Sequence, residues 1–88
     1  MDKGEVSGYL MELISERLRV FDIKPAEVDD HFDLVRSGLL DSMSFIDLVA
    51  SLEEKFHVEV DFERLSEDDA LTNFGRLVEI INAARNAK

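Results

Sequence analysis

The stretch Gly38-Leu39-Leu40-Asp41-Ser42-Met43 lies between a long irregular segment and an amphipathic helix, and it marks the boundary between them. A glycine can adopt a positive φ at no steric cost, so Gly38 predicts a turn. Asp41 is a preferred N-cap residue, and its charge suits the positive end of a helix. A serine that begins a helix, as Ser42 does, most often only caps the first turn or faces solvent. The same position, beside free backbone amides, also suits a phosphate group.

Apolar residues recur at helical spacing on both sides of this stretch. The central helix is predicted from Asp41 or Ser42 to Phe56, with its apolar stripe at Phe45, Leu48, Val49, Leu52 and Phe56. The stripe of an earlier helix is predicted at Val6, Leu10, Leu13, Ile14 and Leu18, closed by Phe21. A last helix is expected to start near Thr72, its predicted N-cap, with an apolar face at Phe74, Leu77, Val78 and Ile81. A short helical turn is expected around residues 61–67. We therefore predict an all-α fold, a four-helix bundle of three main helices and a short third helix.

A long loop, roughly residues 22–41, is expected between the first two main helices. Pro25 interrupts any helix there. Its apolar residues are expected to pin the loop to the helices: Val28, Phe32, Leu34, Leu39 and Leu40. A loop of this length in a small domain is often functional. The 88 residues suffice for one domain, which we expect to span residues 1–88 with its core at about residues 5–84.

The composition excludes several classes of function. Twenty Asp and Glu residues oppose ten Lys and Arg residues, which gives a net charge of −10. This charge disfavours nucleic acids and anionic membranes and favours basic protein surfaces, although acidity can also serve solubility alone. The sequence has no cysteine and only two histidines, so we expect no metal site. No apolar run approaches the roughly 20 residues that span a bilayer, and the N-terminus lacks the features of a signal peptide, so we expect a cytoplasmic protein.

Two alternative functions fit the residues poorly. A catalytic Ser42 would need a base and oxyanion donors, yet only His31 and His57 offer an imidazole, and the glycine-flanked elbow of α/β-hydrolases is absent. We therefore expect no enzyme. A calcium-binding loop at residues 61–69 would need alternating oxygen ligands and a central glycine, a pattern that Phe62 and Arg64 disrupt.

The signature Asp41-Ser42-Met43 closely resembles the Asp-Ser-Leu signature of acyl and peptidyl carrier proteins, with Met43 in place of the usual leucine. The surroundings are similar too, because Phe32-Asp33-Leu34 lies in the preceding loop. Residues 48–56 also have the Leu-x-x-x-Leu-Glu-x-x-Phe spacing that resembles the second helix of carrier proteins. The resemblance covers about residues 5–84. It implies that 4′-phosphopantetheine from coenzyme A is attached to Ser42, with Asp41 as the acidic neighbour. The thiol of the arm would then carry an acyl or aminoacyl group as a thioester, so the carrier itself needs no cysteine.

The resemblance also implies partners for a monomeric carrier. They are a phosphopantetheinyl transferase, an adenylating ligase or other acyl-loading enzyme, and a downstream acyltransferase or synthase. The residues expected to meet them follow Ser42 at helical spacing beside the core stripe: Met43, Asp47, Ala50 and Glu54. Residues 37–42 look more like those of free-standing carriers of aminoacyl or specialised acyl groups, D-alanyl carriers included, than those of housekeeping fatty-acid carriers. The alternative is an unmodified acidic helical interaction module, which gives Asp41 and Ser42 no particular role.

Overall fold

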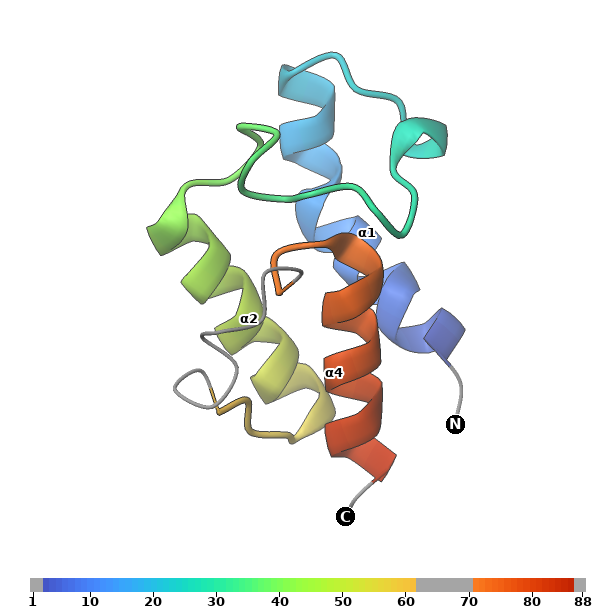
Figure 1. Cartoon of the computed structure of the whole chain (residues 1–88), viewed down its shortest axis with the longest axis vertical. Helices are drawn as coiled ribbons and strands as arrows, with labels where there is room; N and C mark the ends of the chain where they lie inside the picture. Colours follow the sequence, from blue (N-terminus) through green and yellow to red (C-terminus); the bar gives the residue numbers. More distant parts are fainter. Residues whose placement is uncertain (1–2, 62–70, 87–88) are drawn as a thin grey trace.

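The computed structural model describes residues 3–61 and 71–86, which form three long helices and one short 3₁₀ turn. The elements are α1 (Lys3–Val20), η1 (Pro25–Glu27), α2 (Ser42–Phe56) and α4 (Phe74–Asn86). Figure 1 shows α4 packed alongside the other two helices, with the long loop crossing over one end of the bundle. The prediction of an all-α fold is thus confirmed for the described residues. The short third helix expected around residues 61–67 falls, beyond residue 61, outside them.

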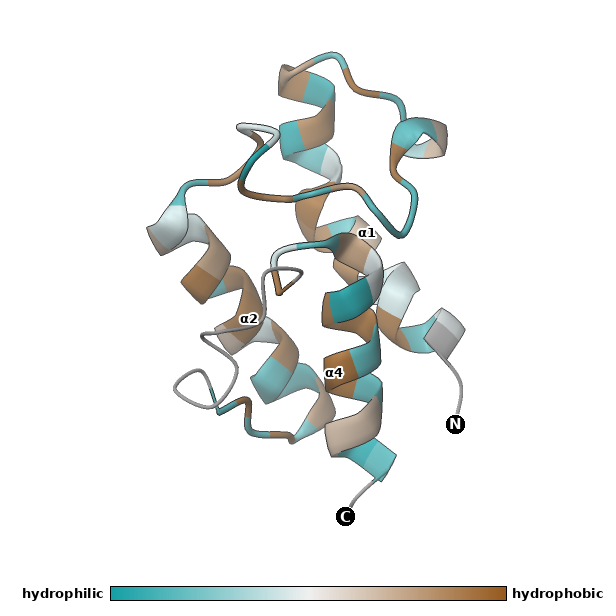
Figure 2. Cartoon of the chain, viewed as in Figure 1, coloured by the Kyte–Doolittle hydropathy of each residue, from teal (hydrophilic) through white to brown (hydrophobic). Residues whose placement is uncertain are grey.

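The core is built from the apolar stripes of the three helices (Figure 2). Every stripe residue predicted on α2 and on α4 is buried. On α1, four of the six predicted residues are fully buried: Val6, Leu10, Ile14 and Leu18. Leu13 packs against the core but is only partly buried. The three faces therefore bury one another, as amphipathic helices of a small bundle must.

Phe21 does not close the stripe of α1, contrary to the sequence-based prediction. Its side chain is 52% exposed. The helix ends at Val20, and Asp22 turns the chain with a left-handed φ of 57°. The Ile23 amide then donates to the Leu18 carbonyl at 2.8 Å, the pattern of a Schellman cap. Because the backbone reverses at this cap, Phe21 leaves the helical stripe.

The long loop is held against the bundle by buried side chains and by backbone hydrogen bonds. Leu34, Leu39 and Leu40 are buried in the core, as predicted. The loop also pairs with the chain that leads into α4, where the Leu34 amide donates to the Thr72 carbonyl at 2.8 Å. The Phe74 amide donates to the Phe32 carbonyl, also at 2.8 Å. These bonds join the middle of the loop to the chain that leads into α4.

Thr72 contributes to this pairing and is not the N-cap of α4, because the helix begins two residues later, at Phe74. The Thr72 hydroxyl donates to Oδ1 of Asp33 at 2.8 Å. The same Asp33 oxygen accepts the amides of Val35 at 2.9 Å and Arg36 at 2.7 Å. The sequence therefore placed a helix cap where the structure has a link between the loop and α4.

Candidate functional site

The N-terminus of α2 is a well-defined helix start at the end of the long loop. Gly38 has a φ of 88°, which confirms the predicted turn. Asp41 is the N-cap, and its Oδ1 accepts the Ser44 amide at 2.8 Å. Ser42 is then the first residue of α2, and its side chain is exposed. The cap is thus supplied by Asp41, which leaves the Ser42 hydroxyl accessible and without a capping role.

The Asp41 carboxylate is stabilised in its charged form. The amide and the hydroxyl of Ser44 are the main causes that hold the pKa of Asp41 below its ordinary value of 3.8. Slight desolvation acts in the opposite direction, whereas the charge of Arg17 and the Met43 amide lower this pKa further. A carboxylate engaged in this way is a stable cap and a poor proton acceptor.

Arg17 of α1 contacts this helix start, a feature that sequence reasoning missed. Its Nη2 donates to Oγ of Ser44 at 3.2 Å, and its Nη1 donates to the Leu39 carbonyl at 3.4 Å. The residues that it joins are more than 20 positions away in the sequence. Helical periodicity places Arg17 only on the polar side of α1, so nothing local in the sequence indicates this contact.

The residues expected to meet partners all lie on the surface of α2. Met43, Asp47, Ala50 and Glu54 are exposed, with Met43 at 69%. Ile46 was not among them, yet it is 49% exposed. A signal for Ile46 was available, since it lies three residues after Met43 and four before Ala50. The surface that follows Ser42 is consequently more apolar than predicted.

A shallow groove of about 210 Å³ runs between α1 and α2 beside this surface. Its apolar lining comes from both helices and from the end of the loop, with Leu13, Leu40 and Leu48 among the residues. Arg17, Ser44 and Asp47 supply polar groups. The groove is therefore next to the first turn of α2.

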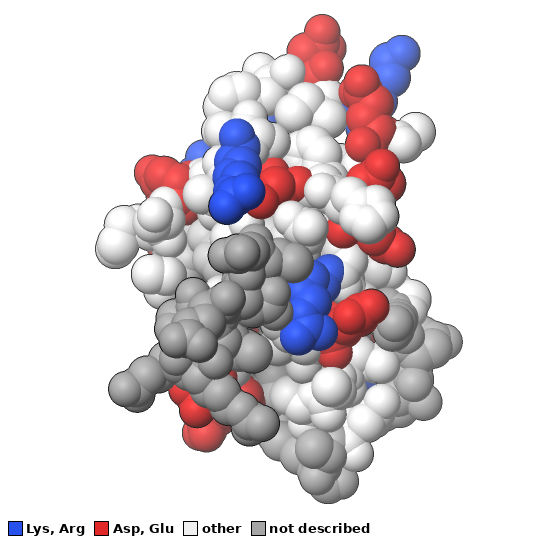
Figure 3. Space-filling view, in the orientation of Figure 1, with Lys and Arg blue, Asp and Glu red and all other residues white. Residues whose placement is uncertain are grey.

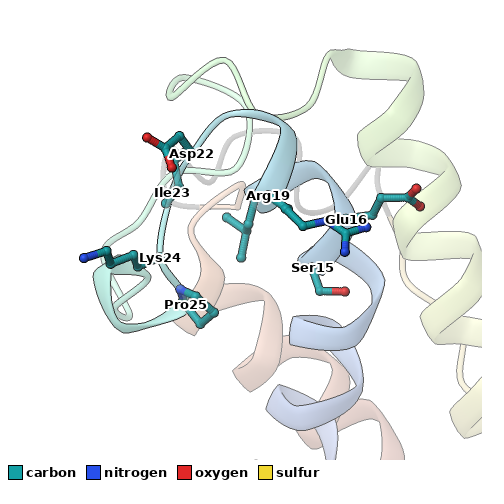
Figure 4. Close-up of a pocket in the computed structure, with 8 residues that line it drawn as sticks. Ser15, Glu16, Arg19, Asp22, Ile23, Lys24 and Pro25 are labelled. Atoms are coloured by element: carbon teal, nitrogen blue, oxygen red, sulfur yellow. The ribbon is translucent and has the colours of Figure 1, made fainter.

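A larger hollow lies elsewhere, between the end of α1 and η1, with a volume of about 660 Å³ (Figure 4). Figure 4 shows Ser15, Glu16 and Arg19 of α1 on one side and the segment from Asp22 to Pro25 on the other. No residue of α2 lines it. This hollow is thus separate from the surface around Ser42.

Both histidines lie outside the first turn of α2. His57 is the C-cap of α2, and a helix of 15 residues separates it from Ser42 by roughly 20 Å. His31 lies in the loop and is exposed.

Within residues 3–61 and 71–86, no cluster of three side chains could hold a metal ion, and no helix is long and apolar enough to cross a membrane. Figure 3 shows acidic and basic residues interleaved on the face in view.

Comparisons of the sequence with known proteins identify the family of this chain. A family model described as "Phosphopantetheine attachment site" matches residues 8–81. The D-alanyl carrier protein of Streptococcus gordonii is 32% identical over 83 residues, which cover 94% of this chain and 99% of that protein. The D-alanyl carrier protein of Leuconostoc citreum is 37% identical over 67 residues, 76% of either chain. No solved structure gives a significant match. The chain therefore belongs to the phosphopantetheine-attachment family of carrier proteins, whose cofactor is covalently bound 4′-phosphopantetheine and whose members are carriers rather than enzymes.

Proposed function

We propose that Ser42 is the residue to which phosphopantetheine is attached, and that the chain carries an aminoacyl group on this arm. The observation that carries the proposal is the exposed Ser42 hydroxyl at the first position of α2, immediately after an N-cap that is already satisfied by Asp41. A phosphodiester there would lie beside the amides of the first helical turn, which favour negative charge. When bound, the arm supplies the thiol that this cysteine-free chain lacks.

Among the described residues, Asp41 and His57 are poor candidates for a base in the attachment. Asp41 is the nearest carboxylate in sequence, but its oxygen accepts the Ser44 amide, and its lowered pKa makes it a weak base. His57 lies at the far end of α2. The proposal therefore requires a separate phosphopantetheinyl transferase that activates the Ser42 hydroxyl.

The proposed cargo is an amino acid, with D-alanine as the first candidate. Its support is the similarity to proteins named D-alanyl carrier protein, together with residues 37–42, which resemble those of free-standing aminoacyl carriers. An adenylating ligase would load such a carrier, and a downstream acyltransferase would receive the aminoacyl group. Fatty-acid synthesis is the less favoured setting on both grounds.

The proposed docking stripe for these partners consists of Met43, Asp47, Ala50 and Glu54, now with Ile46 added. Exposed Met43 and Ile46 form an apolar centre close to Ser42, and Asp47 and Glu54 supply the charged rim. Small transient interfaces have this composition. A basic partner surface would be attracted by the rim and would bury the centre.

The experiment is a two-step loading reaction followed by intact-mass measurement. Incubation with coenzyme A and a phosphopantetheinyl transferase should add one phosphopantetheinyl group. The holo-protein is then offered ATP and D-alanine, L-alanine or a fatty acid, each with a ligase specific for that substrate. A thioester adduct with D-alanine supports the proposed cargo. An unmodified interaction module would gain no mass in the first step.

A further inference from the structure

Arg17 carries a positive charge that the described part of the chain does not neutralise by contact. Its two hydrogen bonds, 3.2 and 3.4 Å long, go to a hydroxyl and a carbonyl, which are neutral acceptors. Within residues 3–61 and 71–86 it forms no ion pair, whereas Arg36 and Arg85 each pair with a carboxylate. In a chain with a net charge of −10, such an arginine beside α2 calls for an explanation.

The place of Arg17 relates it to Ser42. The guanidinium touches Ser44, which lies in the first turn of α2 two residues after Ser42. The two serines lie about 200° apart around the helix, so the guanidinium has to cross this turn to reach Ser42. Arg17 is exposed, so its long side chain can move to a new partner, although its hydrogen bond to the Leu39 carbonyl is part-buried. Its charge already acts on the neighbouring Asp41 carboxylate. A phosphodiester on Ser42 would add a second negative charge next to Asp41, and the repulsion between the two would need compensation.

We propose that Arg17 is a positioning residue for the phosphodiester on Ser42: its guanidinium exchanges the hydroxyl of Ser44 for a phosphate oxygen once the arm is attached. The inference rests on the proposed attachment at Ser42. Arginine is suited to this task because its planar donors form charge-assisted hydrogen bonds with phosphate oxygens. The ion pair would hold the base of the arm on the side of α2 that faces α1, where the groove lined by Leu13 and Leu48 begins.

A purely structural role for Arg17 predicts different behaviour. The contacts to Leu39 and Ser44 also tie α1 to the loop, so replacing Arg17 could destabilise the apo-protein. That effect would be the same with and without the arm. The proposal instead predicts a coupling between Arg17 and the attachment, which appears only in the difference between the holo- and apo-proteins.

The test compares apo- and holo-forms of the full chain in the wild type, Arg17→Gln, Arg17→Lys and Arg19→Gln. Arg19→Gln is the matched control, because Arg19 is an exposed arginine of the same helix and the change in charge is identical. Intact mass first confirms complete loading. We expect attachment to lower the melting temperature of Arg17→Gln by about 2–5 °C more than that of the wild type or the control. Arg17→Lys should retain part of the coupling.

Nuclear magnetic resonance provides a second readout. The Nε–H resonance of Arg17 should move when the wild-type protein is loaded, while that of Arg19 stays in place. The ³¹P resonance of the phosphodiester should differ between the wild type and Arg17→Gln. The inference about Arg17 is wrong if loading shifts the melting temperatures of the wild type and Arg17→Gln equally, leaves the Arg17 resonance in place, and gives both proteins the same ³¹P resonance. The proposed attachment at Ser42 would stand in that case. Failure to load Ser42 at all would overturn the proposed function and the inference with it.

Discussion

Gly75 of α4 lies so close to Asp30 of the long loop that a side chain at position 75 has no room. A Cβ built on Gly75 would lie 2.6 Å from the Asp30 Cβ and 2.9 Å from its Cα. The Gly75 amide donates to the Asp30 carbonyl at 3.0 Å, so the two backbones are directly joined. Glycine in a helix costs up to about 1 kcal/mol relative to alanine, and here this close approach accounts for its presence.

We predict that Gly75→Ala destabilises the fold by about 1–3 kcal/mol, because the backbone of Asp30 must move and the hydrogen bond between them is strained. Chemical denaturation measures the free energy of unfolding. The control is Gly8→Ala on α1, where a Cβ would meet nothing within 4 Å. That change should stabilise the protein by about 0.4–1 kcal/mol. Equal effects of the two substitutions would contradict the steric explanation.

The second prediction concerns the free energy of unfolding at acidic pH. Burial opposes ionisation of Asp33, but the Arg36 amide, the Thr72 hydroxyl, the Val35 amide and the Arg36 charge together lower its pKa below 3.8. A carboxyl whose folded-state pKa is lowered stabilises the fold above the unfolded value, and this contribution is lost as the pH falls through the folded value. The link between the loop and α4 should therefore weaken only below about pH 4.

The variant Asp33→Asn tests this link, because the amide keeps the shape but loses the charge. At pH 7 it should be less stable than the wild type by about 1 kcal/mol. This difference in free energy of unfolding should disappear as the pH falls below 3.8, since the protonated acid resembles the amide. Glu12→Gln removes one negative charge from the exposed face of α1 and should show no such closing gap. A gap for Asp33→Asn that is independent of pH would refute the role of the charge.

The third prediction concerns the docking stripe. Asp47→Lys should slow the transferase reaction about 3- to 10-fold at low salt and less at high salt, because rim charges act mainly on the association rate. Met43→Ala should instead shorten the lifetime of the complex, since it removes a 69% exposed apolar side chain that the partner would bury. Stopped-flow mixing with the transferase separates the two rates.

Glu12→Lys is the matched control for this experiment, because it makes the same charge change on the exposed face of α1. A specific stripe predicts that Glu12→Lys has little effect on association. If it slows association as much as Asp47→Lys does, the transferase senses net charge alone, and the stripe is wrong.

What the sequence predicted well was local. The α2 helix, its Asp41 cap and the turn at Gly38 follow from residues within one or two turns of each other, and all three are confirmed. What it missed depends on contacts between distant segments. The close approach of Gly75 to Asp30 joins residues 45 positions apart. Arg17 likewise meets Ser44 across 27 positions. Helical periodicity carries no information about such pairs.

The two errors have different origins. Thr72 is a good N-cap residue in isolation, yet its hydroxyl bonds to Asp33, 39 positions away, and the helix begins after it. Phe21 continues the apolar spacing of α1, but the cap formed by Leu18 and Ile23 ends the helix first. A tertiary contact overrode the local preference at Thr72, whereas a local helix cap that the apolar spacing does not reveal ended α1 before Phe21.

The most direct test of the central claim is the site of phosphopantetheine attachment. The wild type, Ser42→Ala and Ser44→Ala are incubated with coenzyme A and a phosphopantetheinyl transferase, and their intact masses are measured. We predict one added group on the wild type and on Ser44→Ala, and none on Ser42→Ala. Because Asp41 is the cap, the free energy of unfolding of Ser42→Ala should lie within about 0.5 kcal/mol of the wild-type value. Its failure to load would therefore not reflect misfolding. A mass gain that persists in a folded Ser42→Ala protein would contradict the assignment of Ser42.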